Sequence, residues 1–262
     1  MIERNRGGEG AMTAWLEDIR AAVMFLSILP VRGGAPAWPR LLRAFPLAGA
    51  LIGALSGLVL AIGLLAGLPS GVAAALGLLA ALLASGAMHE DGLADFADSL
   101  GGATVERRLE IMRDPASGAF GVLALIMAVA LQLFALSSLA GARGGLAALC
   151  ALVAVHALSR LLAVLMLHRL PPGRRQGRGH EATCPQGRIL FQAAVAAMAV
   201  SMPLLWGGFG FWRGLVVVLL GWALAEGFIA LCRRLLGGQT GDAAGALEVL
   251  ARCAMLAALS AA

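Results

Sequence analysis

The sequence has little charge and no lysine. Only 13% of its 262 residues are charged and 60% are hydrophobic, whereas a soluble domain has about a quarter of its residues charged and about half apolar. This scarcity of charge excludes an ordinary soluble domain and indicates an integral membrane protein. All 20 basic residues are arginines. They are spread over short segments between apolar runs, so the net charge of +5 does not indicate nucleic-acid binding.

Cysteine is also scarce, and its spacing carries no motif. The four cysteines stand far apart, at Cys150, Cys184, Cys232 and Cys253. Without a C-x-x-C pair or an even spacing, neither a disulfide framework nor a zinc site is indicated. We expect these cysteines to be reduced and mostly packed within helices.

Long apolar runs predict an all-α fold, a polytopic membrane-embedded helical bundle. A bilayer-spanning helix needs about 20 mostly apolar residues. Runs near that length cover residues 45–67, 71–89, 118–142, 145–168, 189–207 and 211–232, with a marginal one at 246–262. The segment 13–30 has apolar residues at helical spacing among charged ones, which is typical of an interfacial or partly inserted helix. We find no internal repeat, so residues 1–262 are expected to form one domain of about six to seven transmembrane helices.

The links between these runs differ in charge. If the N-terminus lies in the cytoplasm, the links 68–70, 143–144 and 208–210 face outside, and Arg143 is the one arginine that they contain. The segments assigned to the inside carry most of the other arginines, as the positive-inside rule expects. Every substantial polar loop then lies at the cytoplasmic face, and we expect the working surface there.

Four carboxylates follow directly after the second apolar run. Within them, Asp91, Asp95 and Asp98 are spaced i, i+4, i+7, which places them within an arc of about 60° on one helix face. Like charges stacked in this way repel each other, and a cation would neutralise them. Oxygen donors without thiolates indicate a hard cation, Mg²⁺ or Mn²⁺. Gly92 and Ala94 keep the surface between the acids low, so we expect room there for a phosphate ester.

The next residues supply groups that suit a phosphate. A short helix from Val105 to Arg113 carries Arg107 and Arg108, and Asp114 ends it before a proline. Another helix is expected to begin near Ser117 and Gly118, where free N–H groups can bind an anion. A cation, guanidinium groups and a helix N-terminus are the parts that phosphoryl transfer requires. The alternative is a solvated acidic helix end, since most charge runs face water.

At these residues the sequence resembles a known family. "HEDGLADFADSLGG" followed by "RRLEIMRDPASGAFGVLAL" is similar to the signature of cobalamin synthase, the adenosylcobinamide-GDP ribazoletransferase of the bacterial cobamide pathway. "FLSILPV", "FPLAGALIGAL" and "GGQTGDAAGA" are similar to further family segments and occur in the family's order. The resemblance covers nearly the whole chain.

The resemblance implies a reaction, a cofactor and a location. The phosphocobinamide part of adenosylcobinamide-GDP would be transferred to α-ribazole or its 5′-phosphate, releasing GMP. The enzyme would depend on Mg²⁺, with Mn²⁺ as a substitute, and would lie in the bacterial inner membrane with its site facing the cytoplasm. Its partners would be these small molecules and membrane lipid, with no nucleic acid; a homo-oligomer stays open.

The resemblance also implies roles for individual residues. The catalytic and metal-binding set would be Asp91, Asp95, Asp98 and Asp114. The phosphate charge would be countered by Arg107, Arg108 and Arg113. Asp242 would bind a second substrate or cap its own helix. Glu90 lies where relatives often carry an apolar residue, so it is not counted among the ligands.

Other polar residues have two interpretations each. His89 would orient a carboxylate or contact the substrate, or else be an interfacial histidine satisfied by water. Arg160, inside an apolar run, needs a partner or a polar cavity. It would bind substrate or join a polar network, with the acidic face as the candidate partner. The loop from His168 to Pro185 is either a positive-inside anchor or a cover that recruits anionic nucleotide. The arginines of that loop that we consider for substrate binding are Arg174, Arg175 and Arg178.

Two other functions are alternatives. A CDP-alcohol phosphatidyltransferase also arranges membrane aspartates for Mg²⁺, but here Asp91-Gly92 is followed by Ala94-Asp95 and not by Ala-Arg. A divalent-ion transporter would carry acids near mid-membrane on several spans, whereas these acids cluster at one edge.

Overall fold

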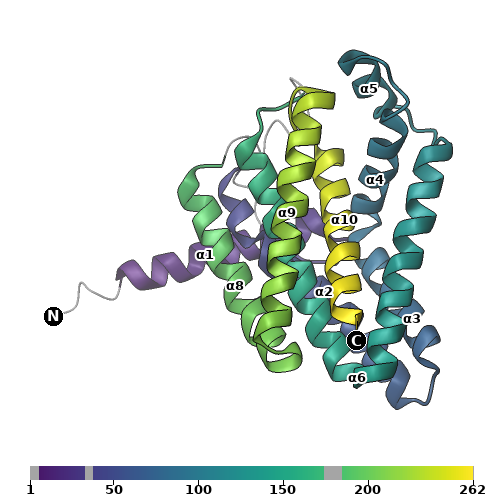
Figure 1. Cartoon of the computed structure of the whole chain (residues 1–262). Helices are drawn as coiled ribbons and strands as arrows, with labels where there is room; N and C mark the ends of the chain where they lie inside the picture. The colour runs from purple at the N-terminus through teal and green to yellow at the C-terminus, as the bar shows by residue number, and fades with distance from the viewer. Residues whose placement is uncertain (1–5, 33–37, 174–184, 262) are drawn as a thin grey trace.

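The chain is helical in the residues that the computed structural model describes, which are 6–32, 38–173 and 185–261 (Figure 1). Within them the only β structure is an isolated bridge between Pro172 and Gln239. The elements in chain order are α1 (Arg6–Leu26), the 3-10 helix η1 (Arg40–Ala44), α2 (Phe45–Leu65), α3 (Ser70–Ser85), α4 (Met88–Ser99), α5 (Val105–Ile111), α6 (Ala119–Arg169), α8 (Gly187–Phe209), α9 (Phe211–Leu236) and α10 (Gly241–Ser260). The prediction of an all-α membrane bundle is confirmed.

The 51 residues of α6 are long enough for two crossings of a membrane. Gly144 has φ 81° and ψ 176°, which no helix contains, and the chain reverses its direction there. In the described part of the chain, five helices, α6 counted once, are long and apolar enough to span a membrane, and the bent pair α3–α4 would be a sixth. With α6 divided at Gly144, the number of crossings falls within the predicted six to seven. The protein is therefore a multi-pass membrane protein.

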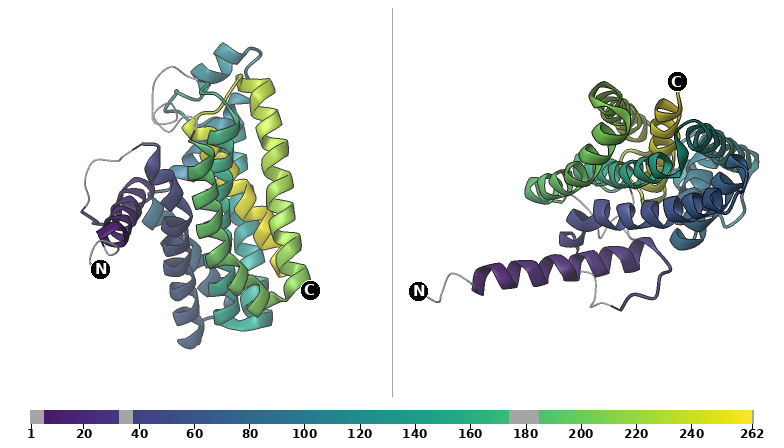
Figure 2. Two further views of the ribbon diagram at one scale, coloured as in Figure 1. Left: turned by 90° about the vertical axis from the view of Figure 1, so that its left-hand side faces the viewer. Right: turned by 90° about the horizontal axis from the view of Figure 1, so that it is seen from below.

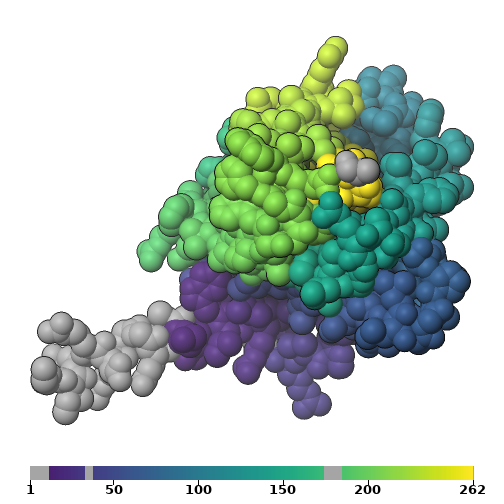
Figure 3. Space-filling model, turned by 60° about the horizontal axis from the view of Figure 1, so that its bottom comes forward, coloured from purple at the N-terminus to yellow at the C-terminus, as the bar shows by residue number. Residues whose placement is uncertain are grey.

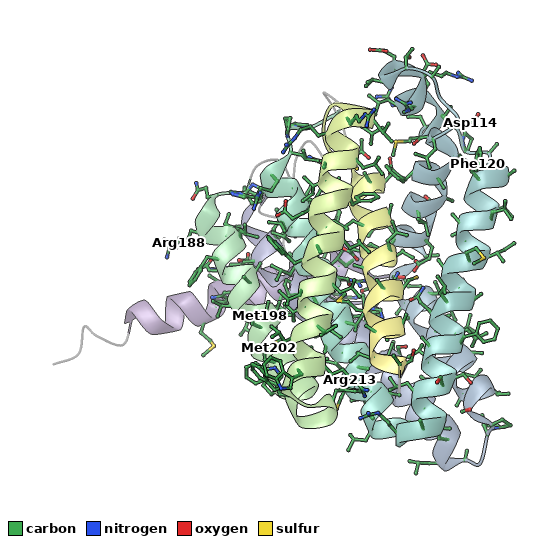
Figure 4. The ribbon with its side chains drawn as sticks, viewed as in Figure 1. Asp114, Phe120, Arg188, Met198, Met202 and Arg213 are labelled. Atoms are coloured by element: carbon green, nitrogen blue, oxygen red, sulfur yellow. The ribbon has the colours of Figure 1, made fainter. Side chains whose placement is uncertain are left out.

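The short and the polar connections lie at opposite ends of the bundle. In Figure 1 the turns after α2, within α6 and between α8 and α9 lie at the lower end, while α5 and the start of α10 lie at the upper end. Asp114 and Arg213 mark these two ends in Figure 4. The predicted segregation of polar segments to one end is confirmed, and its assignment to the cytoplasm stays a prediction.

Helix α1 lies across the side of the bundle and not along it (Figure 2). It is fastened by Asp18, which is buried and accepts from Arg43 Nε at 2.7 Å and from Arg40 Nε at 3.0 Å. The guanidinium of Arg43 also lies 4.2 Å from the ring centroid of Trp15. This crosswise placement fits the predicted interfacial or partly inserted helix.

The innermost helix is α10, which was predicted only as a marginal span from residue 246. Its span is the least hydropathic of the five, at 1.5, yet 72% of it is buried within the protein. Figure 3 shows its yellow end enclosed between α9 and α6. The hydropathy is low because Glu248 and Arg252 both lie inside this helix. Charged residues therefore concealed the most buried helix from a search for apolar runs.

Candidate active site

The helix that carries the aspartates begins at a sharp break. Gly86 ends α3 with φ 61°, Ala87 follows with φ 52°, and α4 leaves at 87° to α3. The amide of Ala87 donates to the carbonyl of Leu82 at 2.9 Å, which closes the end of α3. The predicted span 71–89 is therefore not one straight helix, and α3 with α4 forms either a broken span or a re-entrant pair. His89 does not end a span but lies in the first turn of α4, where it is buried.

The three aspartates of α4 lie in different surroundings. Asp91 is exposed, whereas Asp95 and Asp98 are half-buried. The carboxylate of Asp98 accepts from the amide of Gly118 at 2.7 Å and from that of Gly121 at 2.8 Å. Asp98 therefore caps the N-terminus of α6. Of the N–H groups predicted there for a phosphate, at Ser117 and Gly118, that of Gly118 is thus already bound by a carboxylate of the protein.

Helix α5 places its arginines differently from one another. Arg107 pairs with Glu110 on its own helix at 3.1 Å, and both side chains are exposed. Arg108 donates to the carbonyl of Leu235 at 3.2 Å, which ties α5 to the end of α9. Arg113 is exposed at the same end of the molecule. Two of the three predicted arginines are therefore directed at protein groups in this structure.

Asp114 is exposed near the N-terminus of α6, above Phe120 in Figure 4. Its carboxylate accepts from the amide of Ala116 at 3.0 Å. This local bond shapes the turn between α5 and α6.

The start of α10 lies directly against the aspartate helix. Thr240 caps α10 by accepting from the amide of Ala243 at 3.1 Å, so Asp242 is not the capping residue. A Cβ atom on Gly92 would come within 2.7 Å of the carbonyl oxygen of Asp242. The predicted room for a phosphate ester at Gly92 and Ala94 is wrong, because Gly92 faces the backbone of α10 and Ala94 is 3% exposed. Instead, the contact brings Asp242 beside the helix of Asp91 and Asp95.

The residues that follow α6 are hydrogen-bonded to Gln239, just before α10. The amide of Gly173 donates to the carbonyl of Gln239, and the amide of Gln239 donates to the carbonyl of Pro171, both at 2.8 Å. Gly173 therefore lies beside the start of α10. The predicted substrate-binding residues Arg174, Arg175 and Arg178 lie outside the described residues.

A buried ionic cluster, which the sequence analysis missed, lies between α4, α6 and α10. Glu248 Oε2 is 3.1 Å from His89 Nε2 and 3.2 Å from Arg160 Nε. Glu90 pairs with Arg252 nearby. All five side chains are at most 7% exposed. The predicted partner of Arg160 was wrong: it is Glu248 of α10 and not an aspartate of α4.

The cluster also decides the interpretation of His89 and of Glu90. His89 is not an interfacial histidine satisfied by water, because it is buried with its Nε2 at 3.1 Å from Glu248 Oε2. Glu90 pairs with the guanidinium of Arg252. A usable signal was present in the sequence. His156 and Arg160, and likewise Glu248 and Arg252, stand four residues apart inside apolar runs, where ionisable residues seldom occur without partners.

The described residues do not assemble a metal centre made of protein groups alone. Among them, no three His, Cys, Asp or Glu side chains are grouped so that they could hold one ion. The proposed metal-binding role of Asp91, Asp95, Asp98 and Asp114 stays a prediction. Mg²⁺ is commonly held by one or two carboxylates together with substrate phosphates and water, so a pair of these oxygens would suffice.

Comparison with known proteins agrees with the resemblance of the motifs. The family model described as CobS, cobalamin-5-phosphate synthase, matches residues 18–260. A protein of Allorhizobium ampelinum named adenosylcobinamide-GDP ribazoletransferase is 37% identical, over 95% of this chain and 98% of its own. Proteins of the same name from Azorhizobium caulinodans and Bradyrhizobium diazoefficiens are 40% and 38% identical, over 92% and 89% of this chain and 94% and 89% of their own. No solved structure matches this chain. The matched length and these identities show that the chain belongs to the cobalamin-5-phosphate synthase (CobS) family.

Proposed function

We propose that this protein transfers the phosphocobinamide part of adenosylcobinamide-GDP to α-ribazole or α-ribazole 5′-phosphate. The products would be GMP and adenosylcobalamin or its 5′-phosphate. The observation that carries the proposal is the family match over residues 18–260, together with relatives that bear this activity in their names. The chemistry at the upper end of the bundle agrees with it, because carboxylates and arginines gather where three helices meet.

The reaction requires one bond to form and one to break. A free ribose hydroxyl of the acceptor, which in α-ribazole 5′-phosphate is not the esterified 5′ oxygen, attacks the phosphorus that bears cobinamide and loses its proton, and the bond from that phosphorus to the bridging oxygen of the diphosphate breaks. GMP leaves with the bridging oxygen. Positioning and charge stabilisation provide most of the catalysis in such a transfer.

The side chains suited to this task lie on α4, α5 and α10. Asp91 is exposed and Asp95 is half-buried on the same face of α4, and Asp242 approaches from α10. These oxygens would hold Mg²⁺, which when bound would offset the charge of the diphosphate. Asp91 or Asp95 would also accept the proton of the attacking ribose hydroxyl, because an ionised carboxylate can act as a general base.

Arg107 of α5, and Arg113 just beyond its end, would interact with phosphate oxygens. An exposed ion pair such as Arg107–Glu110 contributes little free energy. A phosphate can therefore replace Glu110 at a small cost. Arg113 is exposed at the same end. Arg108 would instead hold α5 against α9 through its bond to Leu235.

The protein would lie in the bacterial inner membrane with this end in the cytoplasm. This orientation follows from the arginine-rich segments, which favour the cytoplasmic side. It also agrees with the chemistry, since nucleotide-linked substrates are charged and do not enter the hydrocarbon region.

The two alternative functions are less well supported. The family match does not favour a CDP-alcohol phosphatidyltransferase. A cation transporter would need acids within the membrane, and Glu90 and Glu248 do lie inside the bundle. Both are paired with arginines, however, so they do not form a ring selective for cations.

The direct test is GMP release by purified protein in lipid with adenosylcobinamide-GDP, Mg²⁺ and each acceptor. We expect release with α-ribazole or its phosphate, loss of release with EDTA, and no reaction with a CDP-alcohol donor. Absence of GMP release under varied lipid conditions would reject the proposed function.

A further inference from the structure

The His89–Glu248–Arg160 cluster joins the two helices that carry the candidate site. His89 belongs to α4, which also carries Asp91 and Asp95, and Glu248 belongs to α10, which also carries Asp242. His89 Nε2 lies 3.1 Å from Glu248 Oε2, and this polar contact links the two helices inside the protein. The cluster therefore lies behind the aspartates and away from solvent.

The two helices touch at two glycines, one on each. Gly92 of α4 meets the backbone of Asp242, and a Cβ atom on Gly245 of α10 would come within 3.2 Å of the Cα of His89. Small residues let helices approach closely. Without large side chains that interlock, however, they do little to fix the axial position of one helix against the other. A directional polar contact is needed to select one register.

Glu248 is held from behind by α6. Arg160 is fully buried, and its Nε lies 3.2 Å from Glu248 Oε2. The guanidinium is in turn fixed by His156 Nδ1 at 3.1 Å and by Ser159 Oγ at 3.3 Å. Gly49 of α2 leaves the room for it, since a Cβ atom there would come within 2.6 Å of Arg160 Cδ. The carboxylate of Glu248 is thus oriented from two sides.

Stability alone does not explain such a cluster. A buried ion pair costs so much desolvation that apolar residues of similar volume often stabilise a protein equally well or better. Buried ionic groups are better known for selecting one arrangement of helices among several. A second buried ion pair, Glu90 with Arg252, also joins α4 to α10. A third, Asp18 with Arg43, lies away from the aspartates and fastens α1.

We propose that Glu248 is a positioning residue. With His89 and Arg160 it sets the register of α4 against α10, and so sets how Asp91 and Asp95 lie relative to Asp242. The inference rests on the proposed function, because it assigns these three carboxylates to the metal and diphosphate site. Residues that orient metal-binding groups typically change metal affinity by about 10- to 100-fold when they are replaced.

Glu248→Gln tests the inference with little change of volume. We expect Mn²⁺, measured by its electron paramagnetic resonance signal with purified protein, to bind at least about 10-fold more weakly. The Mg²⁺ concentration that gives half-maximal GMP release should rise by a similar factor. Asp18→Asn is the matched control, because it neutralises another buried carboxylate held by arginines. It should lower the thermal stability but leave the Mn²⁺ affinity unchanged.

The double variant Glu248→Met with Arg160→Met separates positioning from folding. It removes both charges, so thermal stability should recover relative to Glu248→Gln, while Mn²⁺ binding should stay weak. Wild-type Mn²⁺ affinity in either Glu248 variant would overturn the inference. Wild-type protein that binds Mn²⁺ without releasing GMP would refute the proposed function. The positioning role of Glu248 would then still be decided by the Mn²⁺ affinities of the wild type and the Glu248 variants. Wild-type protein that binds no Mn²⁺ would overturn the inference together with the metal site.

Discussion

Gly92 on α4 and Asp242 on α10 are in backbone contact. A Cβ atom at residue 92 would lie 2.7 Å from the carbonyl oxygen of Asp242 and 3.0 Å from its Cα. Since both neighbours are backbone atoms, no rotation of a side chain can relieve such a clash. This contact brings the chain's two acidic motifs, 150 residues apart, to one end of the bundle.

Gly92→Ala should therefore impair the transfer reaction. The added methyl group must push α10 away from α4, which separates Asp242 from Asp91 and Asp95, and we expect GMP release to fall at least about 10-fold. Gly227→Ala is the control, because it is also a glycine inside a helix but has no atom within 4 Å of an added Cβ. It should keep its activity and gain up to about 1 kcal/mol of stability from helix propensity. Equal activity of the two variants would contradict the importance of the contact.

Asp98 and Asp91 should differ in their effect on stability. Asp98→Ala removes the acceptor of two amides at the start of α6, and loss of a helix cap costs about 1 kcal/mol. Asp91→Ala removes an exposed side chain and should leave the free energy of unfolding nearly unchanged. Unfolding of both variants in detergent micelles would check this. A stability loss as large in Asp91→Ala as in Asp98→Ala would show that Asp91 has a structural role.

The pair Glu90–Arg252 should be important for stability. Glu90→Leu leaves the guanidinium of Arg252 buried without its partner, and breaking a buried pair in this way costs about 3–5 kcal/mol. The matched exposed pair is Arg107–Glu110, where Glu110→Gln should cost far less. Thermal unfolding of the two variants against the wild type gives the comparison. A small loss for Glu90→Leu would mean that Arg252 finds water or another acceptor.

Arg107 and Arg213 should lie on opposite sides of the membrane. Each is replaced by cysteine in a parent that carries Cys184→Ser, because the cysteines that the structure describes are buried or half-buried. In spheroplasts, a membrane-impermeant thiol reagent should label Arg213→Cys and leave Arg107→Cys unlabelled. In inverted vesicles the labelling should be reversed. The same labelling of both variants would contradict the bundle, and exchanged labelling would contradict the orientation.

Features that depend on local patterns could be predicted from the sequence. The apolar runs predicted the membrane helices. The scarcity of arginine in the short links predicted that these links lie together at one end of the bundle. The i, i+4, i+7 spacing gave one face for Asp91, Asp95 and Asp98. The family motifs pointed to Asp242 without showing where it lies.

Features that depend on contacts between distant segments could not be predicted. The break at Ala87 requires a positive φ in a residue other than glycine, which no composition rule signals. The use of Asp98 as a cap for α6 depends on the path of residues 99–118, which brings the start of α6 beside the end of α4. Arg160 can pair with Glu248 because α10, the least apolar of the candidate spans, lies at the centre of the bundle. Hydropathy alone would place the most apolar helix there.

The most direct test of the account is a comparison of GMP release by wild-type protein and by Asp91→Asn in the same lipid, with adenosylcobinamide-GDP, α-ribazole and Mg²⁺. Asp91 is exposed on the face of α4 that the account assigns to the metal and the diphosphate. We expect Mg²⁺-dependent release by the wild type and a rate at least about 100-fold lower in a folded Asp91→Asn protein. The substitution removes a charge that is used in the transition state. Equal rates in the two proteins would contradict a metal and diphosphate site at Asp91.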